Sequence, residues 1–290
     1  MFHAHSRSRR HTCRTGIAGS GRPAPVGRLT VSIVSMLLLS APLFAQFDPQ
    51  APCERKANGD LYELAEMEAG EILDTRIEYE YRDQDAHATS VLPAEGEPPP
   101  RPDDPDDEDL FYWRQEVSAW SCMYGPERVV DGDPATAWSE GAPGTGAGEV
   151  ILVLLGRAKG AEIWTGFGLS DRLHRRNGRP KRLRVHILQA LTGAANQYDL
   201  TMGFFLKLAS HEVELKDLNG WQPLPLPDFE PLLREEAVVD ALQTVFEEVP
   251  PYLLVPEQLE TPIYLGLEIL EVYPGTAYQD TLISEVRAVK

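Results

Sequence analysis

The segment Val130-Asp-Gly-Asp-Pro-Ala-Thr-Ala-Trp138 decides the fold that this sequence predicts. Two aspartates around a glycine, followed by a proline, have the composition of a tight turn. Carboxylate, hydroxyl and carbonyl oxygens in one turn suit Ca²⁺, which takes roughly six to eight oxygen ligands. The same residues also fit a loop that the aspartate side chains stabilise without metal. Trp138 then places a large ring at the start of the core.

Short apolar segments follow this turn, separated by turn residues. Residues 149–155 are a continuous apolar run, long enough for a strand buried on both faces, and residues 183–188 alternate cleanly. Further strands are expected at 161–167, 204–208, 211–215, 263–273 and 282–289. A series of short strands with turns between them predicts an all-β, antiparallel sandwich.

Four more motifs follow the turn in a recognisable order: Ser139-Glu-Gly141, Gly146-Ala-Gly-Glu149, Asn177-Gly-Arg-Pro-Lys181 and Val272-Tyr-Pro-Gly-Thr-Ala-Tyr-Gln-Asp-Thr-Leu-Ile-Ser-Glu-Val286. With them, residues 110–290 resemble a discoidin-like domain. More narrowly, they resemble the glycan-binding, NAD glycohydrolase translocation type, which is related to the coagulation-factor C-type domains. The resemblance implies a jelly-roll β-sandwich of about eight strands.

The resemblance also implies a structural Ca²⁺ that joins the Asp-Gly-Asp turn to a glutamate near the end of the domain. Carried over residue by residue, its ligands are Asp131, Asp133, Thr136 and Glu285. Ligand binding in such domains uses the loops at one end of the sandwich. The NAD-hydrolysing part of the toxins that give this type its name is a separate domain, and nothing in this sequence resembles it.

Residues 190–262 are longer than the compact domain needs, so we expect an insertion there. After Pro231, residues 232–248 place Val238, Leu242, Val245 and Phe246 on one face, which predicts an amphipathic helix. This insertion either covers the binding loops or helps to form the binding site.

Seven positive charges lie in the segment Arg172–Arg184 of an otherwise acidic chain. The simplest interpretation is a solvated loop that enters a strand. A second is a site for polyanions such as sulfated glycans, lipopolysaccharide or anionic lipid head groups. A third is association with the acidic segment 95–109. The candidate polyanion ligands are Arg172, Arg175, Arg176, Arg179, Lys181 and Arg182.

The amino terminus has the pattern of an export signal. Residues 1–45 carry six arginines and no acid, and residues 29–45 are an apolar run that ends in a small residue. This pattern predicts a signal peptide cleaved after Ala45 and a secreted or periplasmic protein. A retained membrane anchor is the alternative. The remaining chain has 21 bases and 45 acids, a net charge of −24, which disfavours nucleic acid as a partner.

The sequence divides the mature chain into three parts. Residues 46–92 are an extension with short strands, including an alternating one at 75–82. Residues 93–109 hold six prolines and eight acids, which predicts a solvated linker. Residues 110–290 are the sandwich. Cys53 and Cys122 alone remain after processing, so in an oxidising compartment we expect a bridge from the extension to the first strand of the sandwich. Two unpaired thiols are the alternative.

No enzyme motif stands out. The four remaining histidines, His87, His174, His186 and His211, do not form a zinc-protease pattern. The glycine-rich residues 141–148 precede a strand instead of the helix that a phosphate loop needs. The sequence therefore favours an exported, non-catalytic binding protein for a glycan or cell-surface polymer. An adhesive or structural envelope protein that binds another protein or an anionic surface is the second hypothesis, and an unrecognised hydrolase the third.

Overall fold

The computed structural model describes residues 49, 51–54, 56–80, 86–156, 158, 160–195, 199–250 and 262–289. The predicted signal peptide, residues 1–45, lies outside them. Among the described residues, no helix is long and apolar enough to cross a membrane.

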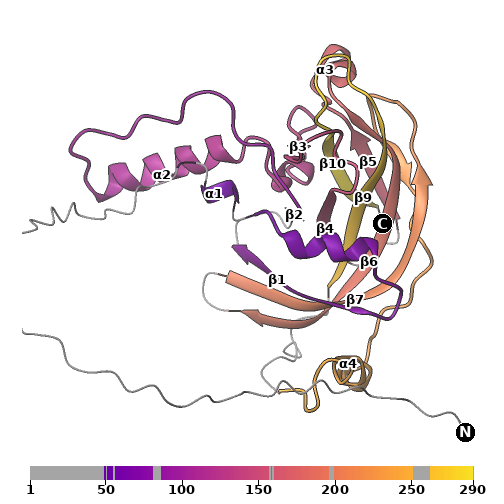
Figure 1. Ribbon diagram of the computed structural model, residues 1–290. Coiled ribbons are helices and arrows are strands. Elements are labelled where there is room, and N and C mark those ends of the chain that lie inside the picture. Colours follow the sequence, from indigo (N-terminus) through magenta and orange to yellow (C-terminus); the bar gives the residue numbers. More distant parts are fainter. Residues whose placement is uncertain are drawn as a thin grey trace, which may run out of the picture. The chain divides into compact units, whose positions relative to one another are not determined.

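The larger of two antiparallel sheets has the strand order β1-β7-β6-β9-β4-β2. The long hairpin of β6 and β7 and the strands β9 and β4 form its middle (Figure 1), and β1 and β2 are its two edges. The strands are β1 (Ile72–Glu80), β2 (Ala86–Ala88), β4 (Val150–Gly156), β6 (Arg179–Ala195), β7 (Asp199–Glu214) and β9 (Ile263–Tyr273).

The smaller sheet has the order β3-β10-β5-β8. Its strands are β3 (Trp138–Ser139), β5 (Gly160–Thr165), β8 (Gln222–Leu224) and β10 (Leu282–Val289). Strand β5 alternates buried and half-buried residues along its whole length, as expected where only one face meets the core. The two sheets confirm the predicted all-β sandwich.

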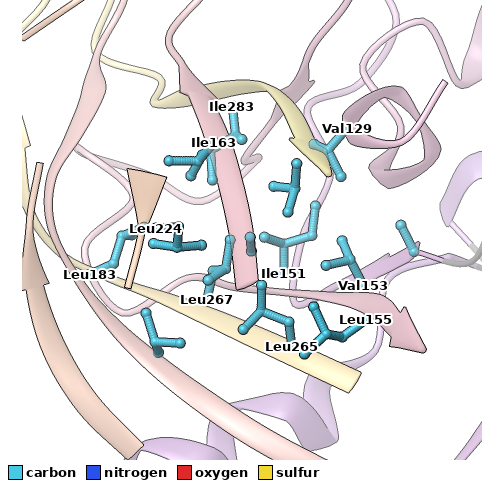
Figure 2. Close-up of a cluster of buried hydrophobic side chains, with 14 of the residues drawn as sticks. Val129, Ile151, Val153, Leu155, Ile163, Leu183, Leu224, Leu265, Leu267 and Ile283 are labelled. Atoms are coloured by element: carbon cyan, nitrogen blue, oxygen red, sulfur yellow. The ribbon is translucent and has the colours of Figure 1, made fainter. Parts of the chain in front are cut away.

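The main core lies between the two sheets. Ile151, Val153 and Leu155 of β4 and Leu265 and Leu267 of β9 meet side chains of the smaller sheet such as Ile163 and Ile283 (Figure 2). The alternate residues of β4, Val150 and Leu152, face the other way and are equally buried. This explains the continuous apolar run at residues 149–155, because β4 has hydrophobic neighbours on both faces.

The amino-terminal extension provides the cover for that second face. The 3-10 helix η1 (Gly59–Ala65) buries Leu61 and Leu64 against Val150, Leu152 and Tyr264. Strands β1 and β2 of the same extension pair with β7 and β4, respectively. Residues 56–80 and 86–92 are therefore built into the larger sheet and its core.

The predicted insertion has a different organisation from the one expected. The two strands predicted at 204–208 and 211–215 are one strand, β7, and its hairpin with β6 extends the sheet through residues 190–195. The predicted helix 232–248 is shorter, α4 (Glu235–Leu242). Its Val238 and Leu242 pack on Leu191, Phe204 and Leu206. The helix thus covers an apolar face of the hairpin.

The segment before the Asp-Gly-Asp turn is helical, which the sequence analysis did not predict. Residues 93–106 contain no regular element, but helix α2 (Asp107–Ser121) begins where the linker was expected to end. Asp106 caps this helix by accepting the N–H of Asp109, and three acids occupy its first turn. The remaining short helices are α1 (Ala51–Glu54), η2 (Pro126–Val129) and α3 (Asp171–Arg176).

Candidate functional site

The Asp-Gly-Asp turn closes on itself through its side chains. The N–H of Asp133 donates to Asp131 Oδ1 at 2.9 Å, and the N–H of Ala135 donates to Asp133 Oδ1 at 2.9 Å. Gly132, with φ of +82°, adopts the left-handed conformation that a residue with a side chain rarely takes. The turn follows η2 and leads into β3, so both of its ends are anchored in the sandwich.

Oxygen atoms converge on the hydroxyl of Thr136. This hydroxyl donates to Asp131 Oδ2 at 2.8 Å. The same oxygen lies 2.9 Å from the carbonyl oxygen of Asp133 and 3.5 Å from that of Arg128. The arrangement offers a carboxylate, a hydroxyl and two carbonyl oxygens within a few ångströms of one another.

Glu285 of β10 brings a second carboxyl group to this cluster. Its side chain is 2% exposed, it shares a hydrogen bond with Asp131, and its Oε1 has no hydrogen-bond partner. Burial first, and then the Asp131 carboxyl, raise the pKa of Glu285 to about 8, although the N–H groups of Gly132 and Asp133 oppose this. Two carboxyl groups in contact and a buried, unpartnered oxygen are what a bound cation would compensate.

The donor set fits Ca²⁺, which accepts carboxylate, hydroxyl and carbonyl oxygens together. No group of three or more histidine, cysteine, aspartate or glutamate side chains gathers for a metal among the described residues. The fit therefore depends on main-chain and hydroxyl oxygens. Asp133 could offer its carbonyl to a cation, since its carboxylate holds the turn, and the Arg128 carbonyl is a further candidate that the sequence motifs do not include.

The loops at this end of the sandwich bond to one another. The N–H of Gly178 donates to Asp280, that of Thr276 to Arg175, and the Thr281 hydroxyl to Thr145, all through carbonyl acceptors. Aromatic and amide side chains lie among them. Trp164 donates its indole N–H to Asn219 at 2.9 Å and meets Trp221 edge-on at 5.7 Å, while Tyr278 is 44% exposed.

The glycine-rich loop 141–148 belongs to the same end and rests on a buried carboxyl. Glu140 is 0% exposed and accepts the N–H groups of Thr281 and Ala142. Burial is the main reason why its pKa rises to about 7. Gly146, with φ of +71°, leaves no room for a side chain, because a Cβ there would meet Glu140 Cγ at 2.5 Å. The loop leads into β4, so no helix start follows it to bind a phosphate.

The six candidate polyanion ligands do not form one free cationic patch. Arg179 is 5% exposed and holds Asp217 through two hydrogen bonds of 3.0 and 2.7 Å. Lys181 pairs with Glu271 at 2.8 Å, and Arg182 pairs with Glu212 at 2.9 Å. These three charges are neutralised within the sheet, because they are directed at acids on β9, β7 and the loop after β7.

The other three candidates lie on α3. Arg172 and Arg175 are exposed, and no acid pairs with either among the described residues. Arg176 donates to the hydroxyl of Tyr278 at 2.9 Å, and its guanidinium lies 5.0 Å from the centre of that ring. The predicted contact with the acidic segment 95–109 is not among the interactions of the described chain. That segment packs on α2 instead, with Trp113 donating to Pro99 and Trp120 to Glu95.

The two cysteines are neighbours but carry no bridge. Cys53 and Cys122 are free, buried thiols, and the two thiols share a hydrogen bond. That contact raises the pKa of Cys53 and lowers that of Cys122. Cys122 caps the end of α2, so it does not lie on the first strand of the sandwich as expected.

A comparison with curated proteins finds no match. Among solved structures, two forms of a GH29 fucosidase from Ruminococcus gnavus in complex with fucose are similar, one of them a mutant. Each has a TM-score of 0.25 and 10% identity and covers 71% of this chain. The alignments span 24% and 25% of the two fucosidase chains, about a quarter of their length.

A family model provides the identification. Residues 115–222 match the NAD glycohydrolase translocation F5/8 type C domain. The matched range begins within α2 and runs through the Asp-Gly-Asp turn, β4, β5, α3, β6 and β7 to the start of β8. It includes three of the four predicted Ca²⁺ ligands, and β10 adds Glu285 next to them. Over this range, the chain carries a discoidin-like domain of the NAD glycohydrolase translocation F5/8 type C family, as its motifs predict.

Proposed function

We propose that this protein is an exported, non-catalytic binding protein that recognises glycans through the loop end of its discoidin-like sandwich. The observation that carries this proposal is the match of residues 115–222 to a domain family whose members often bind carbohydrate. The loop end supports it, because Trp164, Trp221 and Tyr278 place aromatic rings there and Asn219 and Arg176 supply hydrogen-bonding groups. Arg287 covers one face of Trp221 at 3.9 Å and Arg176 lies over Tyr278, so a sugar would stack on the ring surface that they leave.

In this proposal Ca²⁺ has a structural role. Held by Asp131, Thr136, Glu285 and the carbonyls of Arg128 and Asp133, it would add positive charge where the Arg128 guanidinium, 3.5 Å from Asp131, leaves Glu285 without a cation. The other contacts that hold the loop end together come from the chain itself. The turn and β10 are brought together at the cluster, and the neighbouring loops 166–178 and 274–281 are fixed to each other by main-chain hydrogen bonds.

A glycan array probed with the purified protein tests the proposal. We expect binding to a restricted set of glycans, and we expect it to weaken when Tyr278→Ala or Trp221→Ala is introduced. Leu233→Ala is the control, because this apolar residue is also exposed but lies just before α4, which packs on the β6–β7 hairpin. Silence across the array, or equal binding by all variants, would favour the envelope protein that binds another protein.

If the protein is exported, we also propose that its two cysteines form a disulfide. In an oxidising compartment, the contact between Cys53 and Cys122 favours a bridge that closes a loop of about 70 residues and stabilises by roughly 4 kcal/mol. Thiol labelling of denatured, unreduced protein would then find no free cysteine. Two labelled thiols would contradict the bridge and leave the glycan proposal untouched.

A further inference from the structure

Helix α2 exposes two aromatic side chains that have no partner outside the helix in the described chain, and polar residues surround them. Phe111 and Tyr112 are each 54% exposed and meet edge-on at 5.6 Å. The opposite face of the helix is occupied, because Val117 is buried and the segment 93–106 packs on Trp113 and Trp120. Exposed aromatic side chains on a braced helix are typical of protein interfaces, where Tyr, Trp and Phe are enriched.

The surroundings of this aromatic pair are strongly acidic. Residues 103–109 contain six acids and no base. All six side chains are exposed, and no cation pairs with any of them among the described residues. We call Phe111, Tyr112 and these six acids (Asp103, Asp104, Asp106, Asp107, Glu108 and Asp109) the acidic helix surface.

A surface of the opposite charge lies on α3 of the same chain. Arg172 and Arg175 are exposed there without an acidic partner, and Arg176 is held over Tyr278. This surface also exposes apolar groups, Leu169 by 56% and Tyr278 by 44%. We call these five residues the basic helix surface. Each surface thus combines a pair of exposed apolar side chains with an excess of charge of one sign, although Arg114 lies beside the first and Asp171 beside the second.

We propose that the acidic helix surface of one copy of this chain binds the basic helix surface of a second copy. The occupant is a second copy because the chain itself carries the complementary charge and apolar groups. Among the described residues no contact joins the two surfaces within one chain, so both are available. The proposal does not depend on glycan binding.

The contact has two further physical properties. It is small and its charges are exposed, so it should be weak and should fall as salt screens the charges over about 8 Å. Because the two surfaces differ, the contact is made twice in a twofold dimer or repeats in an open chain of copies. The net charge of the protein opposes association at long range, and because salt screens this repulsion too, it reduces the net salt dependence of the contact.

Sedimentation velocity of the protein, as recovered from the cells that produce it, tests the proposal. In 20 mM salt the average sedimentation coefficient should rise between about 5 and 200 µM protein, and in 300 mM salt the rise should be largely lost. Phe111→Ala with Tyr112→Ala should lower the association constant about tenfold at low salt. Circular dichroism would verify that each variant is folded.

A charge exchange identifies the two surfaces. Asp103→Lys with Glu108→Lys should leave the protein monomeric, and so should Arg172→Glu with Arg175→Glu. An equimolar mixture of these two variants should associate again, because each then offers the charge that the other lacks. The Asp106 cap is kept in both variants. A wild-type protein that stays monomeric at 200 µM in low salt would overturn the proposal. Self-association of either charge-reversed variant in the absence of the other would overturn it as well. A basic peptide such as octalysine that binds the acidic helix surface of such a monomer would identify a cationic partner instead.

Discussion

The Asp-Gly-Asp turn and the basic segment each concentrate charge of one sign, but the structure treats the two differently. At the turn, the carboxyl groups of Asp131 and Glu285 lie against each other, and one buried oxygen of Glu285 has no partner. The nearest cation, the Arg128 guanidinium, is 3.5 Å from Asp131. In the basic segment, Arg179, Lys181 and Arg182 each meet a carboxylate of the same chain within 3 Å.

This difference separates charges that the fold itself neutralises from charges that a ligand could neutralise. Paired charges satisfy each other, so they need nothing from outside and mark structure. Like charges in contact within a buried site raise the free energy of the folded protein unless a proton or a cation joins them. The contrast explains why the turn is the better candidate for a ligand site, although the basic segment has the more conspicuous sequence.

The largest effect should come from breaking the ion pair that holds the buried Arg179 guanidinium. Asp217→Ala removes the carboxylate from Arg179, whose side chain is 5% exposed, and leaves it only the carbonyls of Asn177 and Pro274. We expect a loss of about 3 to 4 kcal/mol in the free energy of unfolding, measured by urea denaturation. Asp217→Asn should lose less stability than Asp217→Ala, because the amide oxygen can still accept a hydrogen bond from Arg179. A loss below about 1 kcal/mol would mean that this pair does not hold the loop.

Glu140 shows what burial does to a carboxyl group, because, unlike Glu285, it has no hydrogen bond to a second carboxyl. Its folded pKa of about 7 lies above the value of 4.5 for an ordinary glutamate, so the folded state binds the proton more tightly. Stability from this proton is complete below pH 4.5 and is lost as the pH rises through 7. Wild type should therefore lose up to about 3 kcal/mol relative to Glu140→Gln over this interval. Parallel stability curves for the two proteins would contradict the pKa shift.

Calcium bound at the Asp-Gly-Asp turn should stabilise the folded protein by slightly less than the pH effect at Glu140. A metal bound only by the folded protein at a hundredfold excess over its dissociation constant stabilises by about 2.7 kcal/mol. Chelation with EDTA should therefore lower the melting temperature, and Asp131→Ala should abolish that difference. Asp133→Ala is the informative control, because its carbonyl remains. An identical melting curve with and without EDTA would count against the metal while leaving the sandwich intact.

Much of the sandwich was predictable from the sequence. The apolar run at β4 and the alternation in β6 identify strands, because burial on one or two faces leaves a period-two or continuous pattern. The motifs also brought Asp131, Thr136 and Glu285 into one set across some 150 residues of chain. Periodicity alone could not have joined them, since residues so distant meet only through the sheet.

Other features escaped for identifiable reasons. Helix α2 had a signal, Asp106 as cap with three acids after it, but the prolines and acids before it favoured a linker. The extent of the β6–β7 hairpin was missed because its outer face is covered by α4, a contact that no local pattern reveals. The pairing of the basic segment depends on acids on β7 and β9, which strand register alone brings opposite.

The smallest effect is expected at the exposed end of a series of ion pairs, Lys181–Glu271–Arg182–Glu212, which we call the ion-pair ladder. Lys181 and Glu271 are paired at 2.8 Å, which raises the pKa of the lysine and lowers that of the glutamate, yet their side chains are 38% and 41% exposed. Water already solvates both groups, so the pair gains little from being formed. Lys181→Ala should shift the melting temperature by less than about 2 °C, and Lys181→Met, which keeps the aliphatic stem, by still less. A shift as large as that of Asp217→Ala would show that the ladder acts as one network, in which exposure no longer predicts the strength of each pair.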